Sequence, residues 1–391
     1  MKNVTICDLI GYSGEISGKR VFSRLHPFLN SVKLTARQLR RYSLLGHLPI
    51  LNAYPFLKDI PGADQWVSLY QISDGDSPDL KFRVKDKDHQ RYLVRLTDRL
   101  QYDRKKSEFE LLQLIFARQV PIPRPVRFGL CNQGQSIFTM SEWIYGKAGA
   151  EHLIRQPGED QYAQGIDAAV YLKTIHGSMA PPQSNNWPIL INRKIIHMRH
   201  VCRERQIRAA CADKLLDYLA AQSNLVANRP LSLLHGDFHI GNMVMTFENS
   251  LHLIDFEKWK FGDPISDMGP MVARMHAVSV PFMMGVLDCY FNFQISVQEL
   301  RLLAFYAAID AVACIVWAAE TSPDRLPGAL LQARNLLKDY NHFRSIVPIW
   351  YKRLPEIKHQ GNHHPGILRS TGKISYPSGS RQMDNKPRNL D

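Results

Sequence analysis

The pattern of apolar and polar positions changes character along the chain. Residues 66–145 contain short β-prone runs separated by polar turns, which predict strands at Trp66–Ile72, Leu80–Val84, Tyr92–Leu96 and Gln135–Ile144. A helix is predicted between them at Lys105–Arg118, where apolar residues recur on one face. The prolines of the following VPIPRPV segment end it. This part of the chain therefore predicts a small antiparallel sheet with one helix.

Helical periodicity dominates after about residue 147. Long periodic stretches occur at Tyr162–His176 and Ile195–Leu225, and helices resume from Ile265 to about Arg353. Ser232–Asp255 interrupts them with short β-like pieces. We therefore predict an α+β protein with two lobes, a small sheet lobe at 61–145 and a larger, mainly helical lobe at 146–355. Ligands commonly bind at such junctions.

The two ends of the chain carry most of the positive charge. Of the formal net charge of +13, residues 1–60 hold 9 Lys and Arg against 3 Asp and Glu, and residues 352–391 hold 8 against 3. The centre is nearly neutral, so we expect a basic N-terminal extension of unknown role and a basic tail at 356–391. The tail is rich in Gly, Pro and Ser and is expected to be disordered. A nucleic-acid partner is not expected, because the excess charge lies outside the core.

The composition favours a cytoplasmic protein. No window reaches the run of about 18 uncharged apolar residues that a membrane span needs. The nearest stretch, Leu302–Ala319, contains Asp310 and is predicted to be a buried helix. The N-terminus has Asp8 within its apolar part and no clear cleavage site, so no secretory signal is expected. Six cysteines without a C-x-x-C pair fit a reducing compartment. The oligomeric state is not readable from these features.

Residues suited to phosphoryl transfer gather in LLHGDFHIGNMVMTFENSLHLIDFEKWKFGDPISDMG, which starts at Leu233. Asp237 lies two residues after His235, and Asn242 lies five residues after Asp237. Asp255 follows an apolar strand. Phosphoryl transfer needs a carboxylate that orients the acceptor hydroxyl and takes its proton, and oxygen ligands that hold Mg²⁺ against the phosphates. A loop carrying Asp and Asn, followed by a hairpin that returns a second Asp, provides both.

The strings HGDFHIGN, LIDFE and GDPISDM together resemble the aminoglycoside phosphotransferase and choline kinase-like family. The resemblance covers about 66–345 and implies a protein-kinase-like fold. It implies that Asp237 is the catalytic base and that Asn242 and Asp255 are the metal ligands. Asp267 is then expected to brace the catalytic loop from the start of the next helix. The kinase pattern H-R-D-x-x-x-x-N has the same spacing, with Gly236 here in place of Arg.

The two histidines of the motif have several readings. We expect His235 to brace the loop. His239 is a candidate catalytic residue that contacts the substrate or Asp237, although a structural role is equally compatible. Together they could instead form a hydrolase metal site, but this leaves Asn242 and Asp255 without a role. Asp255 could alternatively cap a helix.

A kinase also needs a strand cation for the α- and β-phosphates and a helix carboxylate that holds it. The strand YLVRL offers Arg95, and the helix offers Glu108 or Glu110. The family resemblance favours Glu108. Arg95 departs from the usual kinase lysine, but Arg occurs in a similar strand of choline kinase-like proteins and grips phosphate bidentately. The alternative is an arginine on a surface strand.

The remaining nucleotide contacts are assigned by position alone. The turn around Gly75 is the candidate phosphate-covering loop, where main-chain amides can bind phosphate. The segment that contains Glu142 and Ile144 is the candidate linker between the lobes, and its main chain is expected to bond the nucleotide base. This does not distinguish ATP from GTP.

The sequence says less about the acceptor. A polycationic aminoglycoside would require an acidic pocket, and the helical lobe offers Glu151, Asp160, Asp167, Asp288, Asp310 and Glu320. Asp310 lies in an apolar helix, and a structural partnership with an Arg or His is its favoured role. Glu257 is also a candidate to face the cleft.

We therefore predict a kinase that uses ATP, with GTP as an alternative, and Mg²⁺ to phosphorylate a hydroxyl of a small molecule such as an aminoglycoside or another antibiotic. The alternatives are a choline, sugar or protein kinase of the same fold, and a catalytically silent kinase-like binding protein.

Overall fold

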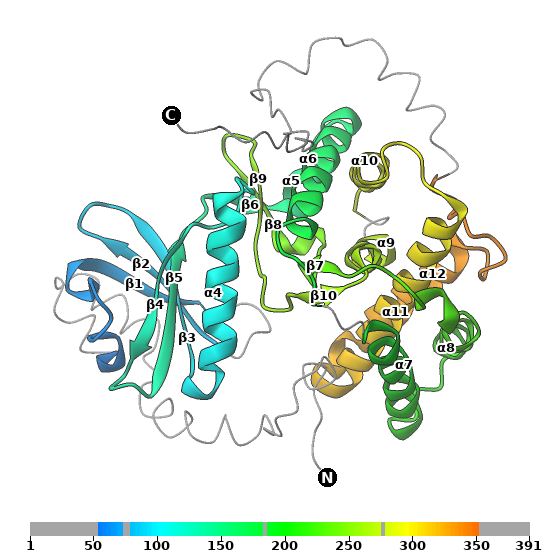
Figure 1. Ribbon diagram of the computed structural model, residues 1–391, viewed down its shortest axis with the longest axis horizontal. Helices are drawn as coiled ribbons and strands as arrows, with labels where there is room; N and C mark the ends of the chain where they lie inside the picture. The colour runs from blue at the N-terminus through cyan, green and yellow to red at the C-terminus, as the bar shows by residue number, and fades with distance from the viewer. Residues whose placement is uncertain (1–53, 73–78, 183–185, 275–277, 352–391) are drawn as a thin grey trace, which may run out of the picture. The chain divides into compact units, whose positions relative to one another are not determined.

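The computed structural model describes residues 54–72, 79–182, 186–274 and 278–351, and Figure 1 shows how their elements are arranged. The basic N-terminal extension up to residue 53 and the basic tail lie outside the described residues, as does Gly75.

The N-terminal half of the described chain forms a five-stranded antiparallel sheet in the order β1-β2-β3-β5-β4 (Figure 1). Its strands are β1 Trp66–Ile72, β2 Leu80–Asp86, β3 Arg91–Asp98, β4 Pro125–Cys131 and β5 Ser136–Glu142. The pairing of Leu80 with Leu96 confirms the predicted hairpin between the second and third strands.

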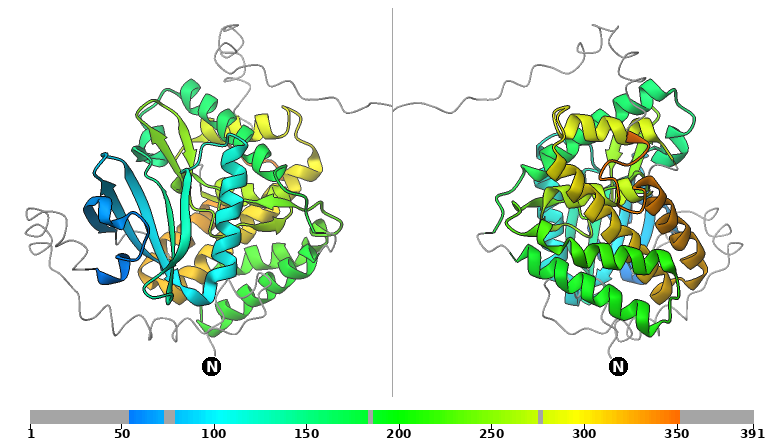
Figure 2. Two further views of the ribbon diagram at one scale, coloured as in Figure 1. Left: turned by 60° about the vertical axis from the view of Figure 1, so that its left-hand side comes forward. Right: turned by 90° about the vertical axis from the view of Figure 1, so that its right-hand side faces the viewer.

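The helix α4, Tyr102–Ala117, crosses one face of this sheet (Figure 2). The Tyr102 ring lies 5.3 Å from the Phe128 ring of β4, between ring centroids. Register pairs Phe128 with Thr139, and Thr139 with Arg95, so Arg95 points to the face that α4 covers.

The opposite face of the sheet carries its apolar core. Phe82, Val94 and Met140 pair across the strands and are buried there. Tyr54 and Leu57, from the segment before β1, are buried in the same core, and the Tyr54 ring lies 5.2 Å from the Phe82 ring. The sheet lobe therefore includes chain upstream of the predicted start at residue 61.

The rest of the described chain is mainly helical, as the periodicity predicted. Its helices are α5 Gly149–Leu153, α6 Gly158–His176, α7 Trp187–Glu204, α8 Ala210–Ala221, α9 Gly269–Arg274, α10 Val280–Tyr290, α11 Val297–Thr321 and α12 Leu326–Asp339. The long periodic stretch predicted at Ile195–Leu225 is two helices, because α7 ends at Glu204 and α8 begins at Ala210.

The helix α11 forms the centre of the helical lobe, in contact with α7, α8, α9 and α12 (Figure 1). Among the described residues it is the one helix long and apolar enough to span a membrane, and 72% of that apolar stretch is buried. The buried helix predicted at Leu302–Ala319 is confirmed. Its apolar character is accounted for by packing inside the lobe.

Short strands hold the motif-bearing loops between the sheet and the helices. β7, Ser232–Leu234, pairs antiparallel with β10, Lys260–Gly262. β8, Met243–Thr246, pairs with β9, Leu251–Leu253, and with β6, Gly146–Ala148. The HGDFHIGN string therefore lies between two anchored strands.

Candidate active site

The buried carboxylate of Asp267 holds the loop between β7 and β8 in place. Asp267 accepts hydrogen bonds from the main-chain N–H groups of His235 and Gly236, each at 2.8 Å. His176 Nε2 lies 3.1 Å from the same carboxylate. Burial opposes ionisation of Asp267, but the His176 contact and the Gly236 bond outweigh it and lower its pKa. The expected bracing contact is therefore present in the geometry.

His235 is fully buried, with 0% of its surface exposed. Its Nε2 donates to the main-chain oxygen of Ile254 at 3.1 Å, and its Nδ1 accepts from the Asp237 N–H at 3.3 Å. Burial lowers the pKa of His235 and keeps the ring neutral. Both ring nitrogens are engaged, so the alternative of a metal site built from His235 and His239 does not fit.

Gly236 adopts a backbone conformation that other residues rarely take, with φ of +86°. A Cβ at this position would lie 2.0 Å from the main-chain oxygen of Lys258. The segment after β9 thus packs directly on the loop. This explains why glycine stands where the kinase pattern has arginine.

Asp237 is surrounded by hydrogen-bond donors and positive charge. Asn242 Nδ2 donates to its main-chain oxygen at 2.9 Å and to Oδ2 at 3.2 Å, and Lys258 Nζ lies 2.9 Å from Oδ2. His239 Nε2 and Arg274 Nη2 lie 3.6 Å and 3.9 Å from Oδ1. Burial would raise the pKa of Asp237, but the His239 and Lys258 contacts prevail and hold it far below its usual range. The carboxylate is therefore ionised at neutral pH.

The hairpin β8–β9 brings Asn242 and Asp255 to the same place. Asn242 precedes β8, Asp255 follows β9, and the main-chain N–H of Ile254 donates to the Asn242 carbonyl at 3.0 Å. Asp255 has a φ of +67° and a side chain that is 40% exposed. It caps no helix, because the next helical turn, η7 Pro264–Met268, is capped by Asp263.

The donors at this hairpin fit Mg²⁺. The side-chain oxygen of Asn242 accepts no hydrogen bond from a described residue, and the one ion pair of Asp255 within the described chain is to Arg95 at 4.0 Å. Mg²⁺ prefers oxygen ligands, takes few from protein and completes its shell with phosphate and water. No cluster of three or more His, Cys, Asp or Glu side chains that could bind a metal occurs among the described residues.

A second group of charges, the Arg95 cluster, lies between β3, α4 and the segment after β9. It consists of Arg95, Lys105, Asp79, Glu108 and Glu257. Arg95 forms its closest ion pair with Glu257, and Lys105 Nζ lies 3.1 Å from Asp79, 3.3 Å from Glu108 and 3.8 Å from Glu257. The expected pairing of Glu108 with Arg95 is therefore not formed. Glu108 pairs with Lys105 on its own helix, which the i,i+3 spacing could have indicated.

Of the candidate linker residues, Glu142 is the last residue of β5 and Ile144 lies two residues beyond it. The main-chain N–H of Glu142 donates to Arg124 at 2.9 Å, and its carboxylate pairs with the Arg124 side chain at 2.5 Å. The main-chain N–H of Ile144 has no hydrogen-bond partner among the described residues. Of the two, only Ile144 has an amide free to bond a ligand.

Asp310 has the structural partner expected for it. Arg274 Nε and Nη2 donate to its two oxygens at 2.8 Å and 2.5 Å. Of the other acids proposed for an aminoglycoside pocket, Asp288 is buried and accepts from Tyr162 at 2.9 Å, and Glu151 pairs with Arg155 at 3.2 Å. Asp310 is the only one of the six linked to Asp237, and it is linked through an arginine.

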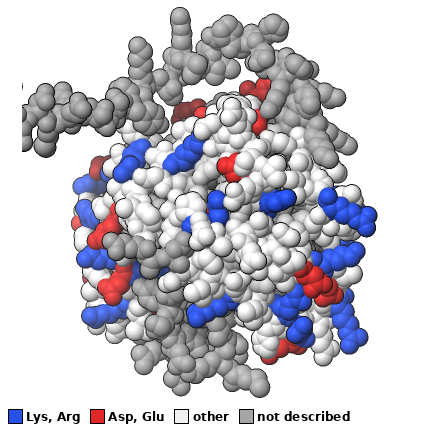
Figure 3. All heavy atoms as spheres, turned by 45° about the vertical axis from the view of Figure 1, so that its right-hand side comes forward, with Lys and Arg blue, Asp and Glu red and all other residues white. Residues whose placement is uncertain are grey.

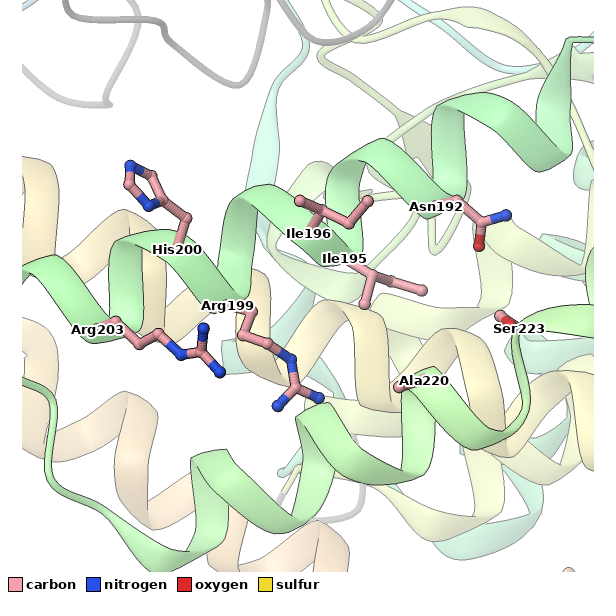
Figure 4. A pocket seen from close by; sticks show the side chains of 8 residues that line it. All are labelled: Asn192, Ile195, Ile196, Arg199, His200, Arg203, Ala220 and Ser223. Atoms are coloured by element: carbon pink, nitrogen blue, oxygen red, sulfur yellow. The ribbon is translucent and has the colours of Figure 1, made fainter.

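One surface groove, of about 580 Å³, lies elsewhere, between α7 and α8 (Figure 4). None of the site residues lines it.

On the face that Figure 3 shows, basic side chains are interspersed with acidic ones and form no continuous stripe.

The comparisons with known proteins agree with this geometry. A model of the phosphotransferase enzyme family matches residues 68–303, which contain Arg95, Asp237, Asn242, Asp255 and Asp267. The chain belongs to this family. No curated protein sequence matches the chain.

Several solved structures share the fold at low sequence identity. A GDP complex of aminoglycoside 2'-phosphotransferase-IIIa is 16% identical with a TM-score of 0.57, over 73% of this chain and 98% of that chain. A choline/ethanolamine kinase family protein from Mesorhizobium loti is 15% identical with a TM-score of 0.51, over 75% and 97%. An amicoumacin kinase bound to AMP-PNP and Ca²⁺ is 12% identical with a TM-score of 0.52, over 73% and 91%. The two-lobed, kinase-like α+β fold is confirmed.

Proposed function

We propose that this phosphotransferase family member is a kinase that transfers the γ-phosphoryl group of a nucleotide to a hydroxyl of a small molecule. The observation that carries the proposal is the Asp237 arrangement. The carboxylate is kept ionised, Asn242 donates to it at 3.2 Å, and the β8–β9 hairpin holds the segment of Asp255 against Asn242.

In this proposal Asp237 accepts a hydrogen bond from the acceptor hydroxyl and aligns its oxygen with the γ-phosphorus. Phosphoryl transfer depends mainly on positioning and charge stabilisation, so a low pKa suits this role better than strong basicity. His239 acts as a positioning residue, since its Nδ1 accepts from the Gly241 N–H at 3.0 Å and its Nε2 faces Asp237. It holds the carboxylate in place and ionised.

Asn242 and Asp255 are the proposed Mg²⁺ ligands. When bound, the ion supplies positive charge to the phosphate oxygens. Arg95 and Lys105 are the proposed phosphate-end cations, and Glu108 orients Lys105. Lys105 was not recognised from the sequence. The main chain at Ile144 is the proposed base contact.

The nucleotide is proposed to be ATP, with GTP as the alternative. The structural neighbours include complexes with ADP, AMP-PNP and GDP, so both bases occur on this fold. The five cysteines among the described residues are free thiols, which supports a cytoplasmic site of action. The lobe boundary at 145/146 is likewise proposed.

The acceptor classes on related folds differ. The similar solved structures include a hygromycin B complex, a kanamycin complex, an amicoumacin kinase and a choline/ethanolamine kinase family protein. A silent, kinase-like binding protein is the second candidate. It is disfavoured because Asp237, Asn242 and Asp255 are all present in one connected arrangement.

The test is a γ-phosphate transfer screen with the full chain, Mg²⁺ and either ATP or GTP. Its acceptors are antibiotics, choline-like alcohols, sugars and hydroxy acids. We expect transfer to at least one acceptor, abolished by EDTA. A protein that binds neither nucleotide with Mg²⁺ would contradict the proposal.

A further inference from the structure

The side of Asp237 that faces the helical lobe is unusually rich in positive charge. Four cations gather there from three elements and one loop: Lys194 of α7, Lys258 after β9, Lys260 of β10 and Arg274 of α9. We call these four residues the basic cluster.

All four residues of the basic cluster lie near the Asp237 carboxylate. Lys258 and Arg274 reach the Asp237 carboxylate at 2.9 Å and 3.9 Å. Lys260 pairs in register with Leu234, which directly precedes His235. The helix α7 packs closely against β10. A Cβ added to Gly262 would lie 2.4 Å from the Trp187 ring. Both Lys194 and Lys260 interact electrostatically with Asp237.

Two of these cations form no ion pair with any residue that the structure describes. Among the described residues, the side chains of Lys194 and Lys260 have no hydrogen-bond or ion-pair partner, and both residues are partly buried. Burial lowers the pKa of Lys194. Burial and the neighbouring Lys194 charge lower the pKa of Lys260 to about 8. Such charges are costly to keep unless something compensates them.

The carboxylates nearby do not balance the basic cluster. Arg274 neutralises Asp310 through two hydrogen bonds, and Lys258 pairs with Asp237. Asp267 is already satisfied by His176 and two main-chain amides. Lys194 and Lys260 are left as excess positive charge beside the proposed catalytic carboxylate.

We infer that the acceptor carries an anionic group, a carboxylate or a phosphate, that binds Lys194 and Lys260 while its hydroxyl meets Asp237. The inference rests on the proposed kinase function and narrows its substrate class. A polycation such as an aminoglycoside is disfavoured by the same charges. Lys258 is not assigned to the acceptor, since its contact with Asp237 also suits it to the transferring phosphoryl group.

The experiment uses inorganic sulfate as the probe, titrated into the full chain at constant ionic strength. Saturating Mg²⁺ and AMP-PNP fill the nucleotide site. The variants are Lys194→Gln and Lys260→Gln, with Lys214→Gln on the exposed side of α8 as a matched control. At about pH 7, below the pKa of Lys260, the amine is charged.

We expect wild type and the control to bind sulfate equally. Each of the two variants should bind it about tenfold more weakly, as expected when a hydrogen bond between charged groups is lost. Both should keep their affinity for AMP-PNP. Their melting temperatures should not fall, because a partly buried charge without an ion-pair partner among the described residues is being removed. D-Glycerate and glycerol 3-phosphate should displace sulfate, whereas glycerol and choline should not, and the tighter of the two anions identifies the group recognised.

Three outcomes would overturn the inference. In the first, wild type binds AMP-PNP but not sulfate. In the second, wild type and both variants bind sulfate equally. In the third, the variants lose affinity for the nucleotide and keep their affinity for sulfate. Failure of wild type to bind AMP-PNP with Mg²⁺ is a separate result and counts against the kinase function itself.

Discussion

The Arg95 cluster and the surroundings of Asp237 have opposite charge balances. In the first, Arg95 and Lys105 face three carboxylates, Asp79, Glu108 and Glu257, with Asp255 at the edge. Around Asp237, the four residues of the basic cluster face three carboxylates, Asp237, Asp267 and Asp310. In our proposals the Arg95 cluster lies beside the phosphates of the nucleotide, and Lys194 and Lys260 bind an anionic group of the acceptor.

The pKa shifts of Glu108 and Lys260 also differ in direction between the two regions. Burial raises the pKa of Glu108 even though Lys105 lies 3.3 Å away. Burial lowers the pKa of Lys260. Glu108 carries the charge in excess in the Arg95 cluster, and Lys260 carries the charge in excess around Asp237.

The largest expected effect is at the point where the two regions meet. Asp237→Asn should lower kcat by about 10³-fold or more, in the range expected when a positioned acid–base group is removed. Nucleotide affinity should stay within about threefold, since the carboxylate contacts the acceptor and not the base or ribose. Steady-state kinetics and calorimetry measure the two quantities. Asp324→Asn, on the exposed surface, is the control and should behave as wild type.

Asp255→Asn tests the acidic side of the comparison. We expect affinity for AMP-PNP to fall about tenfold or more with Mg²⁺, because one of two anionic or polar oxygen ligands is weakened. In EDTA the variant and the wild type should bind alike. Equal affinities with Mg²⁺ present would remove Asp255 from the metal site.

Asp267→Asn tests the support under the loop. Losing the carboxylate that accepts from two buried amides should cost about 2–4 kcal/mol of unfolding free energy at neutral pH. Because the folded-state pKa of Asp267 is lowered, its contribution is present above the unfolded pKa of about 3.9 and is lost as the pH falls through the folded value. The difference in melting temperature between wild type and variant should therefore shrink below about pH 4. A difference that grows on acidification would contradict this.

The smallest expected effect is a difference in coupling energy. It tests whether Glu108 pairs with Lys105, as observed, or with Arg95, as expected from the kinase pattern. In a double-mutant cycle on unfolding free energy, Lys105→Met and Glu108→Gln should couple by about 0.5 kcal/mol or more, as residues in contact do. Arg95→Met and Glu108→Gln should couple less, because they form no ion pair. The reverse order would restore the pairing expected from the kinase pattern.

Some of these features can be predicted from the sequence and others cannot. The fold class, the buried α11 and the Asp237–Asn242–Asp255 arrangement are local patterns, readable from periodicity and spacing. The partner of Arg95 is not, because Glu257 lies 162 residues away and nothing local to Arg95 indicates it. Lys105 is not predicted as a phosphate cation, because the kinase pattern places that cation on a strand, whereas Lys105 lies on the helix in an i,i+3 pair with Glu108.

The basic cluster was also beyond the sequence. Lys194 lies on a helix where surface lysines are ordinary, and only the packing of α7 on β10 brings it toward the loop. The glycine at 236 appeared as a departure from the kinase pattern. Its cause, the close approach of the Lys258 main chain, is a tertiary contact. Functional charges gathered from separate elements require the fold before they can be recognised.

The most direct test of this account is a structure of the full chain with Mg²⁺ and AMP-PNP. The account predicts Mg²⁺ about 2.1 Å from side-chain oxygens of Asn242 and Asp255, with the γ-phosphate facing Asp237 and the phosphates near Arg95 and Lys105. A metal held by other residues, or a nucleotide bound away from the β8–β9 hairpin, would contradict it.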